Sequence, residues 1–156
     1  MINLKNKTAL ITGASSGIGR STALLMAQLG ANLVPGVRRA ALLDTLVSEI
    51  QTIGGQAVAL NGDVCNELYS KQLVELAQTK YGQLDNAFNN ASILGEMGNN
   101  EIISNRGWND TLQTDRIPVS NPGFNSTAQI LSTIPDNIYS IVNECYTMLA
   151  QRDFYR

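Results

Sequence analysis

Residues 8–19 read Thr-Ala-Leu-Ile-Thr-Gly-Ala-Ser-Ser-Gly-Ile-Gly, and this stretch decides the fold. A short apolar run ends at Gly13, which is typical of a parallel strand buried on both faces. Behind it, apolar residues recur at near-helical spacing from 17 to 29, and Gly30 provides a helix stop. The sequence therefore predicts a buried strand, a glycine-rich turn and a helix in immediate succession.

The same alternation of strand and helix continues to about residue 90. The predicted elements after the first helix are a strand at 32–34 interrupted by Pro35-Gly36, a helix at 40–53, a strand at 57–60, a helix at 67–81 and a strand at 84–88 weakened by Asp85 and Asn86. This β-α-β-α-β-α-β order predicts a parallel sheet with helices on both faces and right-handed crossovers. After a loop at 95–105, a further helix is predicted over 107–114.

Composition narrows the classes of function. The chain has 156 residues, 44% of them hydrophobic and 15% charged, which fits one globular domain. The formal net charge is -2, so no basic field favours nucleic acid or an anionic membrane. Histidine is absent, which excludes Ser-His-Asp and Cys-His catalysis and histidine-ligated zinc, and no metal site is expected. The only cysteines, Cys65 and Cys145, form no Cys-x-x-Cys pair, which favours a reducing compartment. No apolar run approaches the ~20 residues that span a bilayer. A cytoplasmic location is therefore expected.

The glycine-rich turn carries the strongest chemical signal. Gly13 would make the tight turn, Gly17 would let a pyrophosphate come close, and Gly19 would let helix and strand pack tightly. The helix N-terminus behind the turn offers unpaired N–H groups and a partial positive charge. The alternative, a tight turn without a ligand, stays open at this point. The candidate dinucleotide-binding residues of the turn are Gly13, Ser15, Ser16, Gly17, Ile18 and Gly19.

Three motifs in order resemble the short-chain dehydrogenase/reductase family over about residues 5–115. They are Thr-Gly-x-x-x-Gly-x-Gly at 12–19, Gly62-Asp63-Val64 after the third strand and Asn89-Asn90-Ala91-Ser92 after the fourth. The resemblance implies a Rossmann-like doubly wound parallel sheet and an NAD(P)-dependent oxidoreductase that acts on a carbonyl or an alcohol. It also implies that Asp63 accepts a hydrogen bond from the adenine amino group, with the Val64 backbone beside it. Asn90 would line the cofactor near its ribose and help hold the central sheet, whereas Ser92 stands where the family usually has glycine.

Arg38 bears on the choice of cofactor. A carboxylate at the end of the second strand binds the ribose 2′-hydroxyl of NAD, whereas an arginine there pairs with the 2′-phosphate of NADP. By resemblance that position is Arg38, and no carboxylate follows until Asp44. NADP(H) is therefore favoured over NAD(H). The alternative is that Arg38 and Arg39 form a solvated basic pair without a ligand.

The catalytic half of the family pattern is not recognisable. The resemblance implies a tyrosine that exchanges the proton, a lysine four residues later, a serine and an asparagine. No tyrosine here has a lysine four residues later, since the last lysine is Lys80, and the asparagine position aligns with Asp115. Ser104, Ser120 and Tyr139 are candidates by residue type only, so no catalytic residue is assigned.

The resemblance ends after about residue 115. We expect residues 1–115 to form a Rossmann-type dinucleotide-binding region, incomplete relative to the family, and 116–156 to form a divergent segment. The chain reads as a truncated or frame-disrupted reductase, or as one with a replaced C-terminal part. Residues 128–134 could supply a substitute strand, and 136–150 a covering helix.

Three functions stay open. The first is an NADP-dependent oxidoreductase, the second a catalytically inactive dinucleotide-binding module. The third is an interaction remnant that pairs with a homologue through a sheet edge exposed at 84–89, because an uncovered edge strand presents unpaired backbone groups. A homo-oligomer is compatible with each of them.

Overall fold

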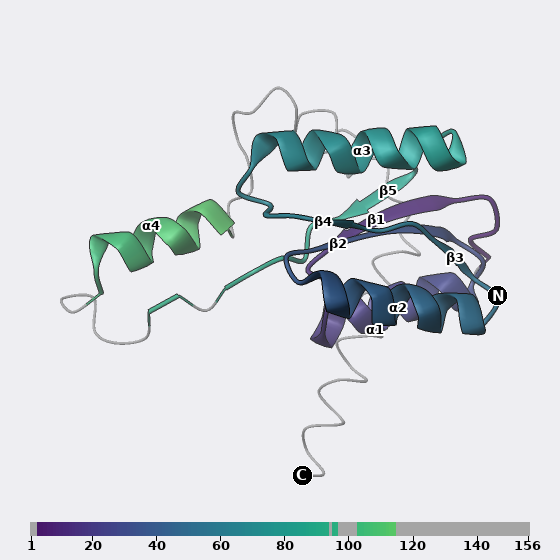
Figure 1. The fold of residues 1–156 in the computed structure, drawn as a ribbon, viewed down its shortest axis with the longest axis horizontal. Coiled ribbons are helices and arrows are strands. Elements are labelled where there is room, and N and C mark those ends of the chain that lie inside the picture. Colours follow the sequence, from purple (N-terminus) through teal and green to yellow (C-terminus); the bar gives the residue numbers. More distant parts are fainter. Residues whose placement is uncertain (1–2, 94, 97–102, 115–156) are drawn as a thin grey trace, which may run out of the picture.

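The computed structural model describes residues 3–93, 95–96 and 103–114. Figure 1 shows three layers, with α1 and α2 below a sheet and α3 above it, while α4 lies beyond the carboxyl ends of the strands. The suggested strand at 128–134 and helix at 136–150 lie outside the described residues. The elements are β1 (Thr8–Thr12), α1 (Gly17–Gln28), β2 (Asn32–Val37), α2 (Ala40–Thr52), β3 (Gln56–Ala57), β4 (Leu60–Asn61), α3 (Glu67–Tyr81), β5 (Asn86–Phe88) and α4 (Asn105–Thr114).

The sheet is parallel in every pairing of the described strands, as predicted. Its order is β3-β2-β1-β5, and β4 pairs with β2 alongside β3. The chain first builds outward from β1 through β2 and then returns to place β5 on the other side of β1. This reversal of direction between β1 and β5 is the switch point of a Rossmann-like doubly wound fold, where such folds bind ligands at the carboxyl ends of the strands.

Each face of the sheet has its own hydrophobic core. All of β1 is buried, because its side chains alternate between the two cores. Ile11 and Leu33 point toward α1 and α2, whereas Leu10 and Val34 point toward α3. The principal helix residues of the first core are Ala23, Met26, Ala27, Leu43, Leu46 and Ile50, and those of the second are Tyr69, Leu73 and Ala77.

The second and third strands differ from the prediction, and one residue explains both differences. β2 does not stop at Pro35 but continues to Val37, while the predicted strand at 57–60 is split into β3 and β4. Leu33 O accepts from Val58 N and Val37 O accepts from Gly62 N, so Pro35, midway between them, faces the same neighbour. Because proline has no N–H to donate, the ladder is interrupted opposite Pro35 and resumes beyond it.

The fourth predicted strand is shorter than expected, and Asp85 lies just before it rather than within it. β5 comprises only Asn86–Phe88. Asp85 Oδ2 accepts from Thr8 N at 2.8 Å, and its Oδ1 accepts from Lys7 Nζ at 2.9 Å. Asp85 therefore lies outside the strand, and its carboxylate ties the start of β5 to the start of β1.

The ionised form of Asp85 stabilises the fold. Burial alone would raise the pKa of Asp85, but hydrogen bonds from Thr8 N, Lys7 and Gln83 outweigh burial and hold the pKa below its usual range. A carboxyl whose pKa is lower in the folded state contributes stability above its unfolded pKa and loses it as pH falls.

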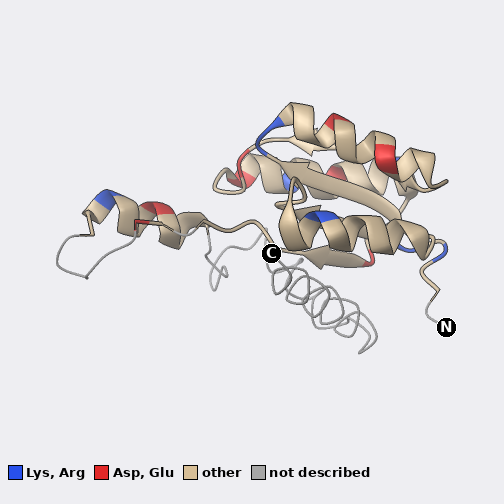
Figure 2. Ribbon diagram, turned by 90° about the horizontal axis from the view of Figure 1, so that it is seen from below, with Lys and Arg blue, Asp and Glu red and all other residues tan. Residues whose placement is uncertain are grey.

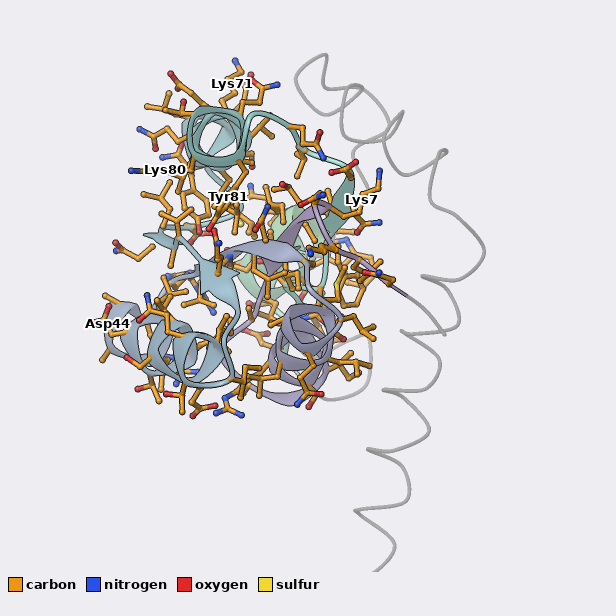
Figure 3. All side chains as sticks on the ribbon, turned by 90° about the vertical axis from the view of Figure 1, so that its right-hand side faces the viewer. Lys7, Asp44, Lys71, Lys80 and Tyr81 are labelled. Carbon is orange, nitrogen blue, oxygen red and sulfur yellow. The ribbon has the colours of Figure 1, made fainter. Side chains whose placement is uncertain are left out.

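We predict that Asp85→Asn lowers the free energy of unfolding by about 1 kcal/mol at pH 7, since one charged hydrogen-bond acceptor is lost. The difference from the wild type should shrink as pH falls below about 4, where the carboxyl of the unfolded chain protonates. Urea denaturation at a series of pH values measures both effects. Asp44→Asn, which changes an exposed carboxyl on α2 (Figure 3), is the control. An equal loss for both variants at all pH values would contradict the prediction.

Candidate dinucleotide-binding site

The turn between β1 and α1 depends on a glycine at 13. Gly13 has a φ of +66°, a conformation that residues with a side chain rarely adopt. A Cβ atom there would lie 2.8 Å from Ala91 Cα and 2.9 Å from Asn90 Nδ2. Gly13 therefore allows the end of β1 to approach the segment that follows β5 more closely than any other residue could.

Gly17, the second glycine of the turn, has open surroundings, unlike Gly13. It begins α1 with a φ of +55°, is exposed, and no protein heavy atom lies within 4 Å of an added Cβ. The N-cap residue Ser16 makes no side-chain hydrogen bond to the helix, and the first turn holds no acidic residue. The N–H groups and the positive end of the helix dipole are therefore presented to the space in front of Gly17.

Asn90 joins the carboxyl ends of β1 and β5. Its Nδ2 donates to Thr12 O and to Gly13 O, each at 3.2 Å. Gly19, in the first turn of α1, packs against the same groups: an added Cβ would collide with Asn90 Nδ2 and lie 2.6 Å from Gly13 O. The three glycines thus divide their roles, since Gly13 and Gly19 enclose the Asn90 amide while Gly17 stays open.

Thr12 is a residue of this site that the sequence analysis did not single out. Its Oγ1 accepts from Asn90 N and from Ala91 N, each at 3.1 Å, and the side chain is buried. The motif at 12–19 begins with this threonine, and that position is the signal by which the sequence could have identified Thr12 as a site residue. Its role depends on β1 and β5 being neighbours, a pairing between residues far apart in the chain.

Arg38 and Asp63 lie near each other at the carboxyl ends of adjacent strands. Arg38 follows β2 directly, and both side chains are exposed. A hydrogen bond from Cys65 N to Asp63 Oδ1, at 2.9 Å, lowers the pKa of Asp63, and the positive charge of Arg38 lowers it further against the effect of burial. Asp63 therefore shapes the local turn and is also ionised beside a cation.

Tyr69, near the start of α3, packs against the strand ends beside this pair and was likewise not singled out. It is buried, and its hydroxyl donates to Leu60 O at 2.8 Å. Burial, together with the negative charge of Asp63, raises the pKa of Tyr69 to about 12, so it stays a neutral donor. Val64 is half-buried and packs against the same core on the α3 side.

The remaining candidates of the turn and of the catalytic half have ordinary surroundings. Ser15 and Ile18 are half-buried in the turn, and Ser92 is exposed after Ala91. The Ser104 hydroxyl donates to Glu96 Oε1 and accepts from Gly107 N, so it caps α4. The helix predicted over 107–114 therefore begins earlier, at Asn105. Asp115, Ser120 and Tyr139 lie outside the described residues.

The charged residues of the described part lie on helices and in connecting loops. Both signs of charge occur on α3 and α4, whereas the charged residues of α2 are acidic (Figure 2). Within residues 3–93, 95–96 and 103–114, no three His, Cys, Asp or Glu side chains gather as a metal site would require. No helix in the same part is long and apolar enough to cross a membrane.

Comparison with known proteins settles the family. Residues 7–143 match the family described as short chain dehydrogenase. The chain belongs to the short-chain dehydrogenase family. It is similar to the cyclohexanol dehydrogenase of Acinetobacter sp. (strain SE19), with 46% identity over 103 residues, which are 66% of this chain and 41% of that protein. It is also similar to the 3-oxoacyl-(acyl-carrier-protein) reductase of Thermotoga maritima, with 40% identity over 92 residues, 59% of this chain and 37% of the relative.

Solved structures agree with this assignment. A short-chain type dehydrogenase/reductase from Mycobacterium marinum matches with a TM-score of 0.72 and 29% sequence identity, covering 83% of this chain and 50% of that one. The chain therefore spans half or less of the length of the relatives it matches here. Both the family and the Rossmann-like fold expected from the motifs are confirmed.

We predict that Thr12→Val lowers the free energy of unfolding by about 2 kcal/mol, because it leaves the partly buried backbone N–H groups of Asn90 and Ala91 without their acceptor. Thr12→Ser retains the oxygen and should recover most of the loss. Chemical denaturation of both variants measures the difference. Equal destabilisation by valine and serine would assign the effect to packing of the methyl group instead.

Proposed function

We propose that this short-chain dehydrogenase binds NADP(H) at the carboxyl ends of β1, β2, β4 and β5 and serves as an oxidoreductase. The observation that carries the proposal is the open glycine turn at Gly17, set at the N-terminus of α1 beside the switch point of the sheet. Its residues suit a diphosphate: Gly17 leaves room for close approach, and the helix offers N–H donors with no acidic residue in its first turn. Ser15, Ser16 and Ile18 contribute the backbone of the same turn.

The adenosine end would lie over the next strands. Asp63 would accept from the adenine amino group, the Val64 backbone would lie beside the ring, and Arg38 would pair with a 2′-phosphate. Arg38 is exposed and contributes a positive charge beside Asp63, which supports NADP(H) over NAD(H). Asn90, which donates to Gly13 O, would line the cofactor near its ribose.

The bound cofactor would supply hydride chemistry, and a carbonyl or alcohol is the proposed substrate class. Two relatives support that class by name, one as a cyclohexanol dehydrogenase and the other as a 3-oxoacyl reductase. A cytoplasmic location follows from the sparse cysteines.

A second candidate is a module that binds the dinucleotide without hydride transfer. It is favoured by the absence of any tyrosine with a lysine four residues later in this sequence. The two candidates separate in one assay, in which NADPH absorbance is followed with a panel of aldehydes and ketones. Consumption of NADPH supports the oxidoreductase, and saturable binding without consumption supports the module.

We predict that Gly17→Ala weakens NADPH binding by about tenfold or more, because the added methyl group displaces a phosphate from charge-assisted hydrogen bonds. Gly54→Ala is a matched control: Gly54 follows α2, has a φ of +80° and is equally open around an added Cβ. Both changes should cost about 1 kcal/mol of stability through the left-handed backbone. Calorimetric titration should show weakened binding only for Gly17→Ala, and equal affinity in the two variants would remove the turn from the site.

We predict that Arg38→Gln raises the Kd for NADPH about tenfold and leaves the Kd for NADH unchanged, because only NADPH carries the 2′-phosphate. Arg39→Gln is the control, since the neighbouring Arg39 is also exposed and is the N-cap residue of α2. Fluorescence titration with both cofactors measures the ratio. A wild-type chain with equal affinity for NADPH and NADH would remove the role given to Arg38.

A further inference from the structure

Tyr69 fills a space that two glycines leave open. An added Cβ at Gly62 would collide with the Tyr69 ring, lying 2.6 Å from Cε2 and 2.8 Å from Cγ. An added Cβ at Gly36, on the neighbouring strand β2, would lie 2.7 Å from the Tyr69 hydroxyl. The side chain is only 4% exposed, so one aromatic ring from α3 contacts both strands at their carboxyl ends.

The hydroxyl of Tyr69 adds a directional contact to this packing. It donates to Leu60 O at 2.8 Å, and Leu60 is the residue of β4 that pairs with Gly36 of β2. The next link between the strands is the hydrogen bond from Gly62 N to Val37 O, at 3.0 Å. Tyr69 therefore bonds to β4 at the point where that strand pairs with β2.

This junction sets the relative position of Arg38 and Asp63. Arg38 directly follows Val37, and Asp63 directly follows Gly62, so each side chain begins one residue beyond the hydrogen bond that joins the strands. β4 has only two residues and is separated from β3 opposite Pro35, so its own ladder with β2 is short. A short ladder fixes the strand end weakly, and the buried contact from α3 compensates for this.

We propose that Tyr69 is a positioning residue for the adenosine end of the cofactor, holding the ends of β2 and β4 at the spacing at which Arg38 and Asp63 act together. This role rests on the proposed function, because it concerns the same two residues. Tyr69 does not reach the ligand itself, since it is buried beneath the strand ends. Tyr69 acts through the backbone at the ends of β2 and β4, which it contacts.

The first test is the Tyr69→Phe variant, which keeps the ring and removes the hydrogen bond to Leu60 O. The Kd for NADPH is expected to rise about fivefold, because part of the binding free energy would then be spent on ordering the ends of β2 and β4. The Kd for NADH should rise less, because NADH lacks the phosphate that Arg38 holds, so the selectivity for NADPH falls. A role limited to stability would lower the melting temperature and leave the ratio of the two Kd values unchanged.

Tyr81→Phe provides the matched control. Tyr81 lies on the same helix at its other end, is half-buried and points toward the sheet, whereas Lys71 points away from it (Figure 3). This variant also removes one hydroxyl from α3, so its selectivity for NADPH should equal that of the wild type. A fall in selectivity as large as that of Tyr69→Phe would overturn the positioning role.

The second test needs no cofactor. Hydrogen exchange at Gly62 N should be faster in Tyr69→Phe than in the wild type, because the Gly62–Val37 hydrogen bond opens more often. Gly36→Ala should lower the melting temperature by pressing on the Tyr69 hydroxyl, and adding Tyr69→Phe should recover part of that loss, a coupling expected only of groups in contact. Unchanged exchange at Gly62, or strictly additive melting temperatures, would overturn the inference.

The outcomes separate the two proposals. A wild-type chain that binds neither dinucleotide overturns the proposed function, and the positioning role with it. A wild-type chain that binds NADPH, with Tyr69→Phe unchanged in affinity, selectivity and exchange at Gly62, overturns the positioning role alone.

Discussion

The hydrogen bonds between the ends of β1 and β5 are the constraint on which the site depends. Thr12 Oγ1 accepts from the backbone N–H groups of Asn90 and Ala91, and the Asn90 amide donates to the carbonyls of Thr12 and Gly13. These contacts bring together two segments that are nearly eighty residues apart in the chain. They fix the direction in which the first strand leaves the sheet, and so the place where the turn meets the N-terminus of α1. A buried set of this kind is stabilising only when each member has its partner, which makes it sensitive to single substitutions.

The same packing arrangement, a pair of glycines that makes room for one side chain, occurs twice along the carboxyl edge of the sheet. In the first place, Gly13 and Gly19 lack the Cβ atoms that would push the Asn90 side chain away. In the second, Gly36 and Gly62 do the same for the ring and hydroxyl of Tyr69. In both cases a missing side chain on one strand or turn admits a hydrogen-bonding side chain from a distant element. The first supports the segment proposed for the diphosphate, and the second supports the segment proposed for the adenosine end.

The proposed chemistry has two parts, the binding of a dinucleotide and the transfer of a proton. The described geometry bears on the first, and the family pattern bears on the second. The described residues suit the binding of a dinucleotide at a helix N-terminus and a basic strand end. Proton transfer in the family pattern needs a tyrosine whose pKa is lowered by a lysine four residues later, and this sequence holds no such pair. Tyr69 does not substitute for it, because burial and Asp63 raise its pKa to about 12 and its hydroxyl is already bonded to Leu60 O. Binding and turnover are therefore separate questions for this chain.

By itself, the sequence determined the order of strands and helices, the parallel sheet and the glycine turn, because these follow from local periodicity and from backbone conformations that only glycine adopts readily. The helices at 17–28, 40–52 and 67–81 were predicted to within a residue for that reason. The tertiary structure alone decided that β2 continues through Pro35, since the missing N–H matters only relative to the strand that it faces. It also decided the roles of Thr12, Asp85 and Tyr69, whose partners are set by strand pairing and helix packing rather than by neighbours in the chain. Local sequence patterns indicate which backbone conformations a segment can adopt. Contacts between distant residues exist only once the strands have paired.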